Sequence, residues 1–156
     1  MIGSRRKAHF QVEAEIVISA PAALVWAVLV DLAAYSDWNS FAYSVKSTLR
    51  VGDRLTMKLR LRPRWGWNIL IVEEVTLVDA QRRLGWRTLS PAWLLQGERF
   101  QMLEALDVNR TRYTTSEAFS GILAPLVKWF IGQDFQRGYE NVAHDLKQRA
   151  ETLASS

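Results

Sequence analysis

The chain has 156 residues, of which 49% are hydrophobic and 23% are charged, and its net charge is +4. This is ordinary globular usage, so the composition excludes an intrinsically disordered body, and the length favours one domain with a sizeable core. The absence of cysteine excludes disulfides, thiolate nucleophiles and thiolate metal sites, and it fits the reducing cytoplasm, where we expect the protein to be located.

The first elements are a strand and a helix. Apolar and polar residues alternate over residues 10–19, which predicts a half-buried strand. Pro21 then suits the first turn of a helix, with Ser19 available as a cap. A helix is predicted over residues 21–35 because its apolar residues share one face: Leu24, Val25, Val28, Leu29 and Leu32.

From Tyr43 onward the period changes to two residues, which predicts about six strands joined by short turns. We expect these strands at residues 43–49, 54–62, 67–78, 83–89, 97–106 and 110–120. After Gly121 the helical period returns and predicts a long C-terminal helix that begins near residues 123–126. Its apolar stripe consists of Leu126, Phe130, Tyr139, Val142, Leu146 and Leu153.

This order of elements predicts an α+β domain over residues 10–153, with flexible ends at 1–9 and 154–156. Short connections between successive strands favour an antiparallel meander of about six or seven strands. Only the C-terminal helix is long enough to cover the apolar face of such a sheet, so the sheet must curve around it. A curved sheet that grips a helix leaves an interior space, which predicts a site for a small, largely apolar molecule.

Three parts of the chain also resemble a known superfamily. They are Ile18–Trp26 running into Asp31–Asn39, Val75–Val78 running into Arg83–Trp86, and Gly97–Phe100 together with Glu117–Leu126. Through them the chain resembles the SRPBCC superfamily, also called START-like or helix-grip proteins, in its polyketide cyclase/dehydrase-like branch. The likeness spans almost the whole chain, and it implies a helix-grip fold with a deep cavity between sheet and helix.

The resemblance implies no single activity, because members include lipid carriers, hormone receptors and aromatase/cyclases. Our first hypothesis is a carrier or sensor of a small hydrophobic or amphipathic molecule that is lipid-like, polyketide or aromatic. The alternatives are an aromatase/cyclase-type enzyme and a protein-interaction module that uses the groove. The sequence has no nucleophile elbow, metal-ligand spacing or phosphate loop, so we predict no catalytic residue, metal or cofactor.

The predicted cavity wall contains charged residues. Tyr113, Thr115, Glu117 and Phe119 share the bulkier face of their strand, which we expect to point inward. Arg99 has the right parity on the neighbouring strand to pair with Glu117, either as a structural salt bridge or to orient a ligand. The complete predicted lining is Trp38, Phe41, Leu59, Leu61, Trp86, Arg99, Gln101, Tyr113, Thr115, Glu117, Phe119 and Phe130.

The strand phase around Arg99 has an alternative in which Phe100 and Met102 point inward, and Trp86 has an alternative role in core packing. In many relatives a histidine stands where this chain has Arg99, and an aromatic residue stands where it has Gln101. These departures predict a more polar cavity wall.

A basic aromatic patch is predicted at a strand end, where Arg62, Arg64, Trp65 and Trp67 lie close together in the sequence. It is either a solvated strand end or a surface for transient contact with an anionic membrane. The other basic residues are dispersed, so we expect no nucleic-acid partner. Both a monomer and a homodimer remain open.

Overall fold

The computed structural model describes residues 7–156. It contains seven strands and three α-helices, with short 3₁₀ turns before α2 and between β3 and β4. The helices are α1 (Ala22–Val30), α2 (Tyr35–Trp38) and α3 (Ala124–Ala154). The strands are β1 (Phe10–Ile18), β2 (Ala42–Lys46), β3 (Arg54–Arg62), β4 (Trp67–Asp79), β5 (Arg83–Thr88), β6 (Gln96–Asp107) and β7 (Arg110–Ser120).

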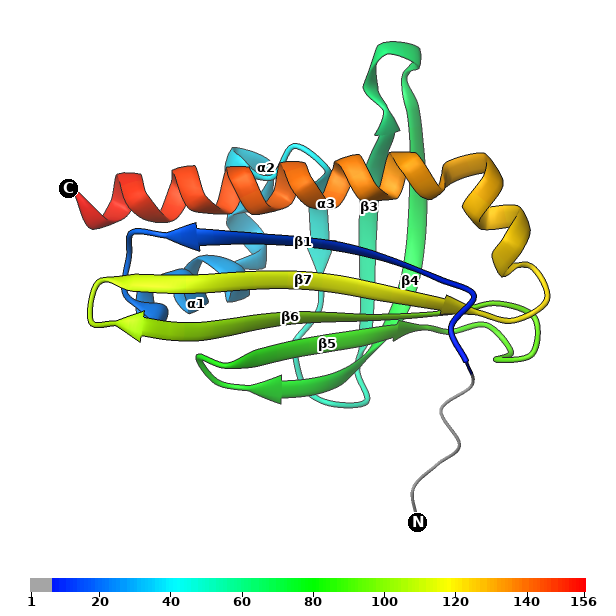
Figure 1. Ribbon diagram of the computed structural model, residues 1–156, viewed down its shortest axis with the longest axis horizontal. Coiled ribbons are helices and arrows are strands. Elements are labelled where there is room, and N and C mark those ends of the chain that lie inside the picture. The colour runs from blue at the N-terminus through cyan, green and yellow to red at the C-terminus, as the bar shows by residue number, and fades with distance from the viewer. Residues whose placement is uncertain (1–6) are drawn as a thin grey trace.

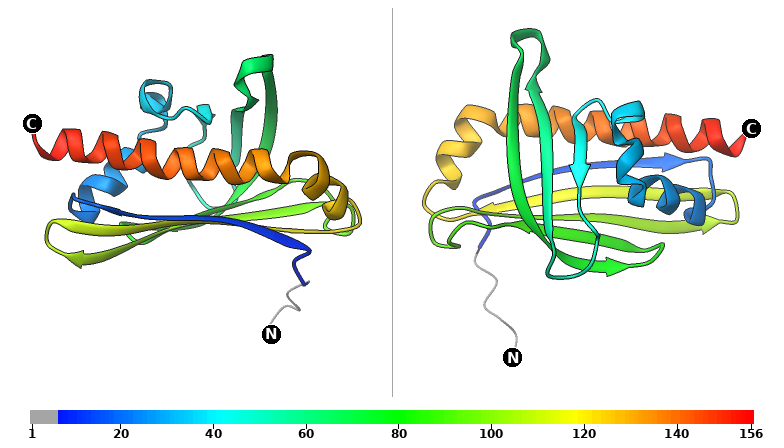
Figure 2. Two further views of the ribbon diagram at one scale, coloured as in Figure 1. Left: turned by 45° about the horizontal axis from the view of Figure 1, so that its top comes forward. Right: turned by 180° about the vertical axis from the view of Figure 1, so that it is seen from behind.

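All seven strands form one antiparallel sheet in the order β1-β7-β6-β5-β4-β3-β2. The sheet curves around α3, and α1 and α2 lie at the end of the sheet near the C-terminal half of that helix (Figures 1 and 2). The helix-grip α+β fold predicted from the sequence is therefore confirmed. β1 forms one edge of the sheet and pairs with the last strand, β7, where Phe10 stands opposite Phe119.

The two-residue period sets the face of each central strand. In β7 the odd-numbered residues Thr111 to Phe119 are buried, as the strand pattern predicted. In β6, Arg99, Gln101 and Leu103 are buried, so this strand has its predicted phase and the alternative phase is wrong. The register between these strands places Arg99 directly opposite Glu117.

The long helix α3 begins at Ala124, within the predicted range, and has Pro125 in its first turn. Its buried face includes Phe135, Tyr139, Val142 and Leu146. α1 is shorter than predicted and ends at Val30, because the backbone leaves the helical region at Asp31. The expected strand at residues 43–49 is also shorter, since β2 ends at Lys46.

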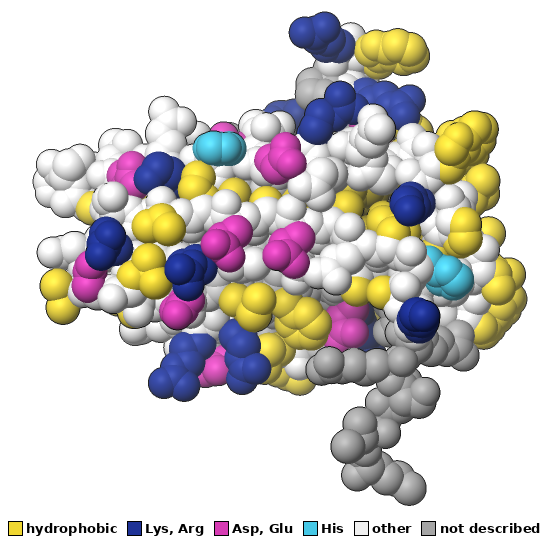
Figure 3. Space-filling model, in the orientation of Figure 1, with side chains coloured by type: hydrophobic (Ala, Val, Ile, Leu, Met, Phe, Trp, Pro, Cys, Tyr) yellow, Lys and Arg dark blue, Asp and Glu magenta, His cyan; other side chains and the backbone are white. Residues whose placement is uncertain are grey.

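The hairpin of β3 and β4 projects beyond α3 (Figures 1 and 2), and Lys and Arg side chains gather on it (Figure 3). Part of the predicted flexible N-terminus, residues 1–6, lies outside the described residues. The backbone N–H of His9 donates to the carbonyl of Phe119 at 2.8 Å. Within residues 7–156, no helix combines the length and apolar character needed to cross a membrane.

Candidate functional site

An inner cavity of about 230 Å³ lies between the curved sheet and α3. A cavity of ~150 Å³ can hold benzene, so this space suits a molecule of about two fused rings. Most of its wall is apolar. The apolar lining residues are Phe41, Met57, Leu59, Ile69, Ile71, Leu95, Phe119, Val127, Ile131 and Phe135, together with the indole of Trp86.

Four ionisable side chains interrupt this apolar wall: Glu73 from β4, Arg99 from β6, Glu117 from β7 and Tyr139 from α3. We call these four residues the polar cluster. All four are buried. Because burying an isolated charge is costly, their arrangement must compensate charge within the cluster.

Arg99 is the cation of the polar cluster. Its Nε donates a hydrogen bond to the hydroxyl of Thr115 at 3.2 Å. Its guanidinium carbon lies 4.3 Å from the ring centroid of Tyr139 and 5.3 Å from that of Trp86. These aromatic faces stabilise the buried charge by cation–π attraction.

Glu117 accepts a hydrogen bond from the hydroxyl of Tyr139. Burial raises the pKa of the Glu117 carboxyl, whereas this hydrogen bond and the charge of Arg99 act in the opposite direction. A Cβ at Gly97 would overlap the Glu117 carboxylate, so the glycine leaves room for it. Arg99 and Glu117 point to the same cavity as predicted, but the hydrogen bonds of the two groups go to Thr115 and Tyr139 respectively.

Glu73 is the second buried carboxyl of the polar cluster. Burial, together with repulsion from Glu117, raises the pKa of Glu73 to about 8, although Arg99 partly offsets this shift. Near neutral pH Glu73 therefore keeps its proton. The protonated Glu73 carboxyl and the Arg99 guanidinium both offer hydrogen-bond donors to the cavity.

A second layer of polar residues lies behind the cavity wall. The hydroxyl of Tyr113 donates to Oε1 of Gln101 at 2.6 Å. Gln101, Tyr113 and Thr115 were predicted to line the cavity, but the structure places them beside it as buried supports. The buried indole N–H of Trp86, in the cavity wall itself, has no hydrogen-bond partner among the described residues.

The structure brings half of the predicted lining residues together in the inner cavity: Phe41, Leu59, Trp86, Arg99, Glu117 and Phe119. Trp38 instead packs near α1, in a separate small pocket with Leu24 and Leu153, because α2 lies at the other end of the sheet. Phe130 is 54% exposed, since Val127 and Ile131 form the inward face of α3 at that point.

Sequence reasoning missed Glu73 and Tyr139. Glu73 shares its parity in β4 with Ile69, Ile71 and Val75, so a carboxyl on an otherwise apolar face was the available signal. Tyr139 belonged to the predicted helical stripe, but its contact with Glu117 joins residues 22 positions apart and has no local signature.

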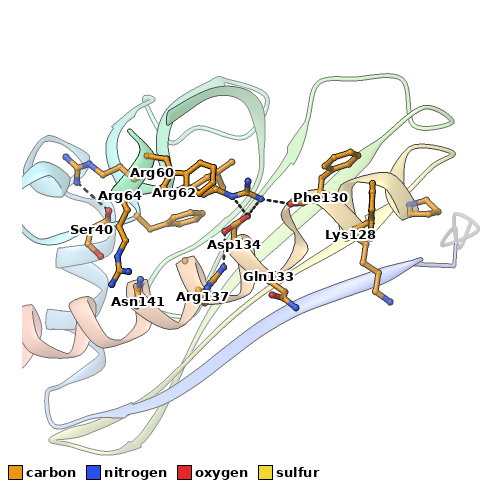
Figure 4. Close-up of a pocket in the computed structure, with 16 residues that line it drawn as sticks. Ser40, Arg60, Arg62, Arg64, Lys128, Phe130, Gln133, Asp134, Arg137 and Asn141 are labelled. Atoms are coloured by element: carbon orange, nitrogen blue, oxygen red, sulfur yellow. Dashed lines mark hydrogen bonds and ion pairs between the residues drawn. The ribbon is translucent and has the colours of Figure 1, made fainter. Parts of the chain in front are cut away.

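A second, open depression lies between the β3–β4 hairpin and the first half of α3 (Figure 4). We call it the outer groove; Leu61 and Phe130 line it, and Phe41 lies between it and the inner cavity. Arg62 joins its two sides, because its guanidinium donates to the carboxylate of Asp134 at 3.1 Å and to the carbonyl of Phe130 at 2.9 Å. Arg137 also contacts Asp134, at 3.1 Å.

Comparison with known proteins agrees with this architecture. A curated relative, oxopyrrolidines biosynthesis cluster protein O of Penicillium oxalicum, is 26% identical, over 83% of this chain and 81% of its own length. The Zhui aromatase/cyclase of a Streptomyces species superposes with a TM-score of 0.74 and is 19% identical, with 91% of this chain and 93% of that chain covered.

A START superfamily protein of Mycobacterium smegmatis superposes with a TM-score of 0.69 at 17% identity, over 92% of this chain and 98% of that chain. At such low identity these structures show the fold alone. The model of the family described as polyketide cyclase / dehydrase and lipid transport matches residues 9–151. The chain therefore belongs to this polyketide cyclase/dehydrase and lipid transport family.

Proposed function

We propose that the protein is a carrier or sensor that binds a small, largely apolar molecule in the inner cavity. The polar cluster orients an uncharged oxygen of that molecule, such as a ketone or a phenol. The observation that carries the proposal is the position of this buried cluster in the wall of an otherwise apolar cavity. Apolar burial supplies affinity, whereas a few convergent polar groups supply orientation.

The donors of the cluster determine which polar groups suit it. Arg99 and protonated Glu73 carry hydrogen-bond donors, and the Trp86 indole N–H lacks a partner among the described residues. A ligand oxygen that accepts hydrogen bonds matches these donors. A ligand carboxylate matches less well, since it would bring another buried acidic group beside Glu73 and Glu117.

The experiment is ligand-observed NMR with a series of naphthalene compounds of nearly constant shape. We expect acetylnaphthalene and naphthol to bind more tightly than naphthalene, and naphthoate to bind more weakly than either. Ile131→Phe fills the cavity from α3 and should abolish binding of the whole series. Val108→Phe, at an exposed turn residue, is the matched control and should leave binding unchanged. Equal binding to both variants would place the site elsewhere.

A second candidate is an aromatase/cyclase-type enzyme, which one specific observation favours. A carboxyl with a pKa of about 8 inside a cavity can both donate and accept a proton near neutral pH, and Glu73 is such a group. Its test uses a poly-β-ketone thioester as substrate. If the protein is a cyclase, Glu73→Gln should lose ring formation while it still binds acetylnaphthalene. If wild type forms no cyclic product faster than buffer, this candidate fails and the carrier proposal stands.

A further inference from the structure

The outer groove exposes two large aromatic side chains. Trp65 on the β3–β4 hairpin is 82% exposed, and Trp129 on α3 is 78% exposed. Contact of so much aromatic surface with water is unfavourable, and such patches mark interaction sites on soluble proteins. Tryptophan is also the residue that accumulates at membrane–water interfaces, because its ring is apolar and its N–H remains hydrated.

The outer groove is also strongly basic. Its lining includes five cations and a single carboxylate, Asp134, so its net charge of +4 equals that of the whole chain. Asp134 is itself occupied by Arg62 and Arg137. Of the remaining cations, Arg60 lies over the ring of Tyr43, with its guanidinium carbon 4.2 Å from the ring centroid, whereas Arg64 and Lys128 are exposed and can face a negative partner. The lining cations are Arg60, Arg62, Arg64, Lys128 and Arg137.

Aliphatic side chains continue the groove at the start of α3. Ile122, Leu123 and Leu126 are exposed there. The exposed Trp93 lies next to them in the chain fold, because its backbone carbonyl accepts a hydrogen bond from the N–H of Ile122 at 3.0 Å. Hydrophobic side chains gather at this end of the molecule in the space-filling view (Figure 3). Aliphatic groups do not stack on nucleic-acid bases, but they enter the acyl region of a bilayer, so this rim favours a membrane over a nucleic acid.

We propose that the outer groove and this aliphatic rim dock on the surface of an anionic phospholipid bilayer. The cations face lipid phosphates, and Trp65 and Trp129 lie at the level of the headgroups. Phe41 lines both the outer groove and the inner cavity, so docking places the cavity beside the bilayer. Vesicle binding itself does not depend on an occupied cavity, and the two proposals can fail separately.

The test is co-sedimentation of the full chain with phosphatidylcholine vesicles that contain or lack phosphatidylserine. Wild type should sediment with the anionic vesicles and should dissociate as NaCl screens the charges. Each cation near such a surface strengthens binding by roughly fivefold, so Arg64→Gln with Lys128→Gln should weaken the partition constant about 25-fold. Replacement of Trp65 and Trp129 by alanine should weaken it by at least about tenfold, since both rings leave the interface.

The matched control replaces two exposed cations on distant turns, Arg50→Gln with Arg82→Gln, and should retain wild-type sedimentation within about twofold. Ile131→Phe, which fills the cavity, should also retain it. Equal losses in the control and the groove variants would overturn the proposal, because binding would then reflect net charge alone. Equal sedimentation with vesicles that contain and that lack phosphatidylserine would overturn it as well. The proposal would also be overturned if the wild-type chain binds single-stranded DNA but does not sediment with the vesicles.

Discussion

The guanidinium of Arg99 lies over the ring of Tyr139, and the hydroxyl of the same tyrosine donates to Glu117. One helical side chain therefore contacts both opposite charges that the sheet places in the cavity wall. The cation interacts with the aromatic face and the carboxylate with the polar edge. This arrangement reduces the cost of two buried charges without a direct salt bridge between them.

Tyr139→Phe separates the two roles of this side chain. The ring remains over Arg99, but Glu117 loses its hydrogen bond, so we expect the free energy of unfolding to fall by ~1–3 kcal/mol in urea titrations. The pKa of Glu117 should rise further, because the lost bond favoured its charged form. In the variant, the folded state therefore loses more free energy than wild type when Glu117 ionises. The difference in unfolding free energy between wild type and variant should grow as the pH increases.

Tyr113→Phe is the control for this change. It removes another buried tyrosine hydroxyl, whose bond to Gln101 involves no carboxylate. This variant should lower the free energy of unfolding by about 1 kcal/mol, and the loss should not vary with pH. If both variants show the same pH profile, the Tyr139 hydroxyl does not act on the charge of Glu117.

The parts of this site that sequence predicted are those governed by strand parity. A fixed two-residue period placed Arg99 and Glu117 on inward faces, and antiparallel pairing made them neighbours. Parity was less informative in β4, because Leu70 and Val72 make its outer face apolar as well. Glu73 was therefore not recognised as an inward carboxyl.

Helical periodicity left a different ambiguity. At the start of α3 two apolar stripes compete, one through Leu126 and Phe130 and the other through Val127 and Ile131. A period of 3.6 residues fits both, and only the packing of the helix on the sheet selects the second. This is why Phe130 was wrongly expected in the cavity, whereas the structure places it in the outer groove.

Glu117→Gln tests whether the polar cluster discriminates between ligands. The substitution keeps the side-chain shape but removes the charge that balances Arg99. We expect affinity for naphthoate to increase by about tenfold, equivalent to ~1.4 kcal/mol, while affinity for naphthalene changes by less than about twofold. Calorimetric titration at about pH 6 lies below the pKa of Glu73 in the wild type, and because Glu117→Gln removes part of the repulsion that raises this pKa, a Glu73→Gln background in both proteins keeps the second position uncharged.

Glu98→Gln is the matched control, since this exposed residue is the neighbour of Arg99 in the same strand. It should leave both affinities unchanged. If Glu117→Gln lowers thermal stability but shifts naphthoate and naphthalene binding equally, the charge has a structural role only.

Glu73 gives the folded protein a characteristic pH dependence. Its pKa is raised from 4.5 to about 8 on folding, so the folded state holds a proton that the unfolded state has lost between these values. Stability should therefore decrease as the pH rises through this window, by an amount of the order of a few kcal/mol, and level off above it. Urea midpoints measured across the window check this prediction.

Glu73→Gln should flatten this part of the profile, because the amide has no proton to lose. The neighbouring Glu74→Gln is the control: Glu74 contacts Arg87 at 3.4 Å on the other face of the strand, and its replacement should leave the slope intact. A wild-type profile that is flat or rises over this range would contradict the assignment of a protonated Glu73.

The last prediction concerns how closely α3 packs against Phe41. A Cβ at Gly138 would lie 2.5 Å from Cε2 of Phe41, the side chain between the inner cavity and the outer groove. Alanine is favoured over glycine within a helix by roughly 1 kcal/mol, but this overlap forces the ring or the helix to move. We therefore expect Gly138→Ala to lower the free energy of unfolding by ~1–3 kcal/mol.

Gly132→Ala provides the comparison within the same helix. The nearest atom to a Cβ there is Cγ of Lys128 at 3.6 Å, an ordinary contact. With no overlap, only the helix propensity changes, and stability should increase by up to about 1 kcal/mol. Phe41→Leu should recover part of the loss in Gly138→Ala, since it removes the ring that the new methyl group meets. Opposite signs for the two glycine variants in urea unfolding, with this rescue, would establish Gly138 as the point of closest approach between α3 and Phe41; equal and favourable effects would show that the helix is free to shift there.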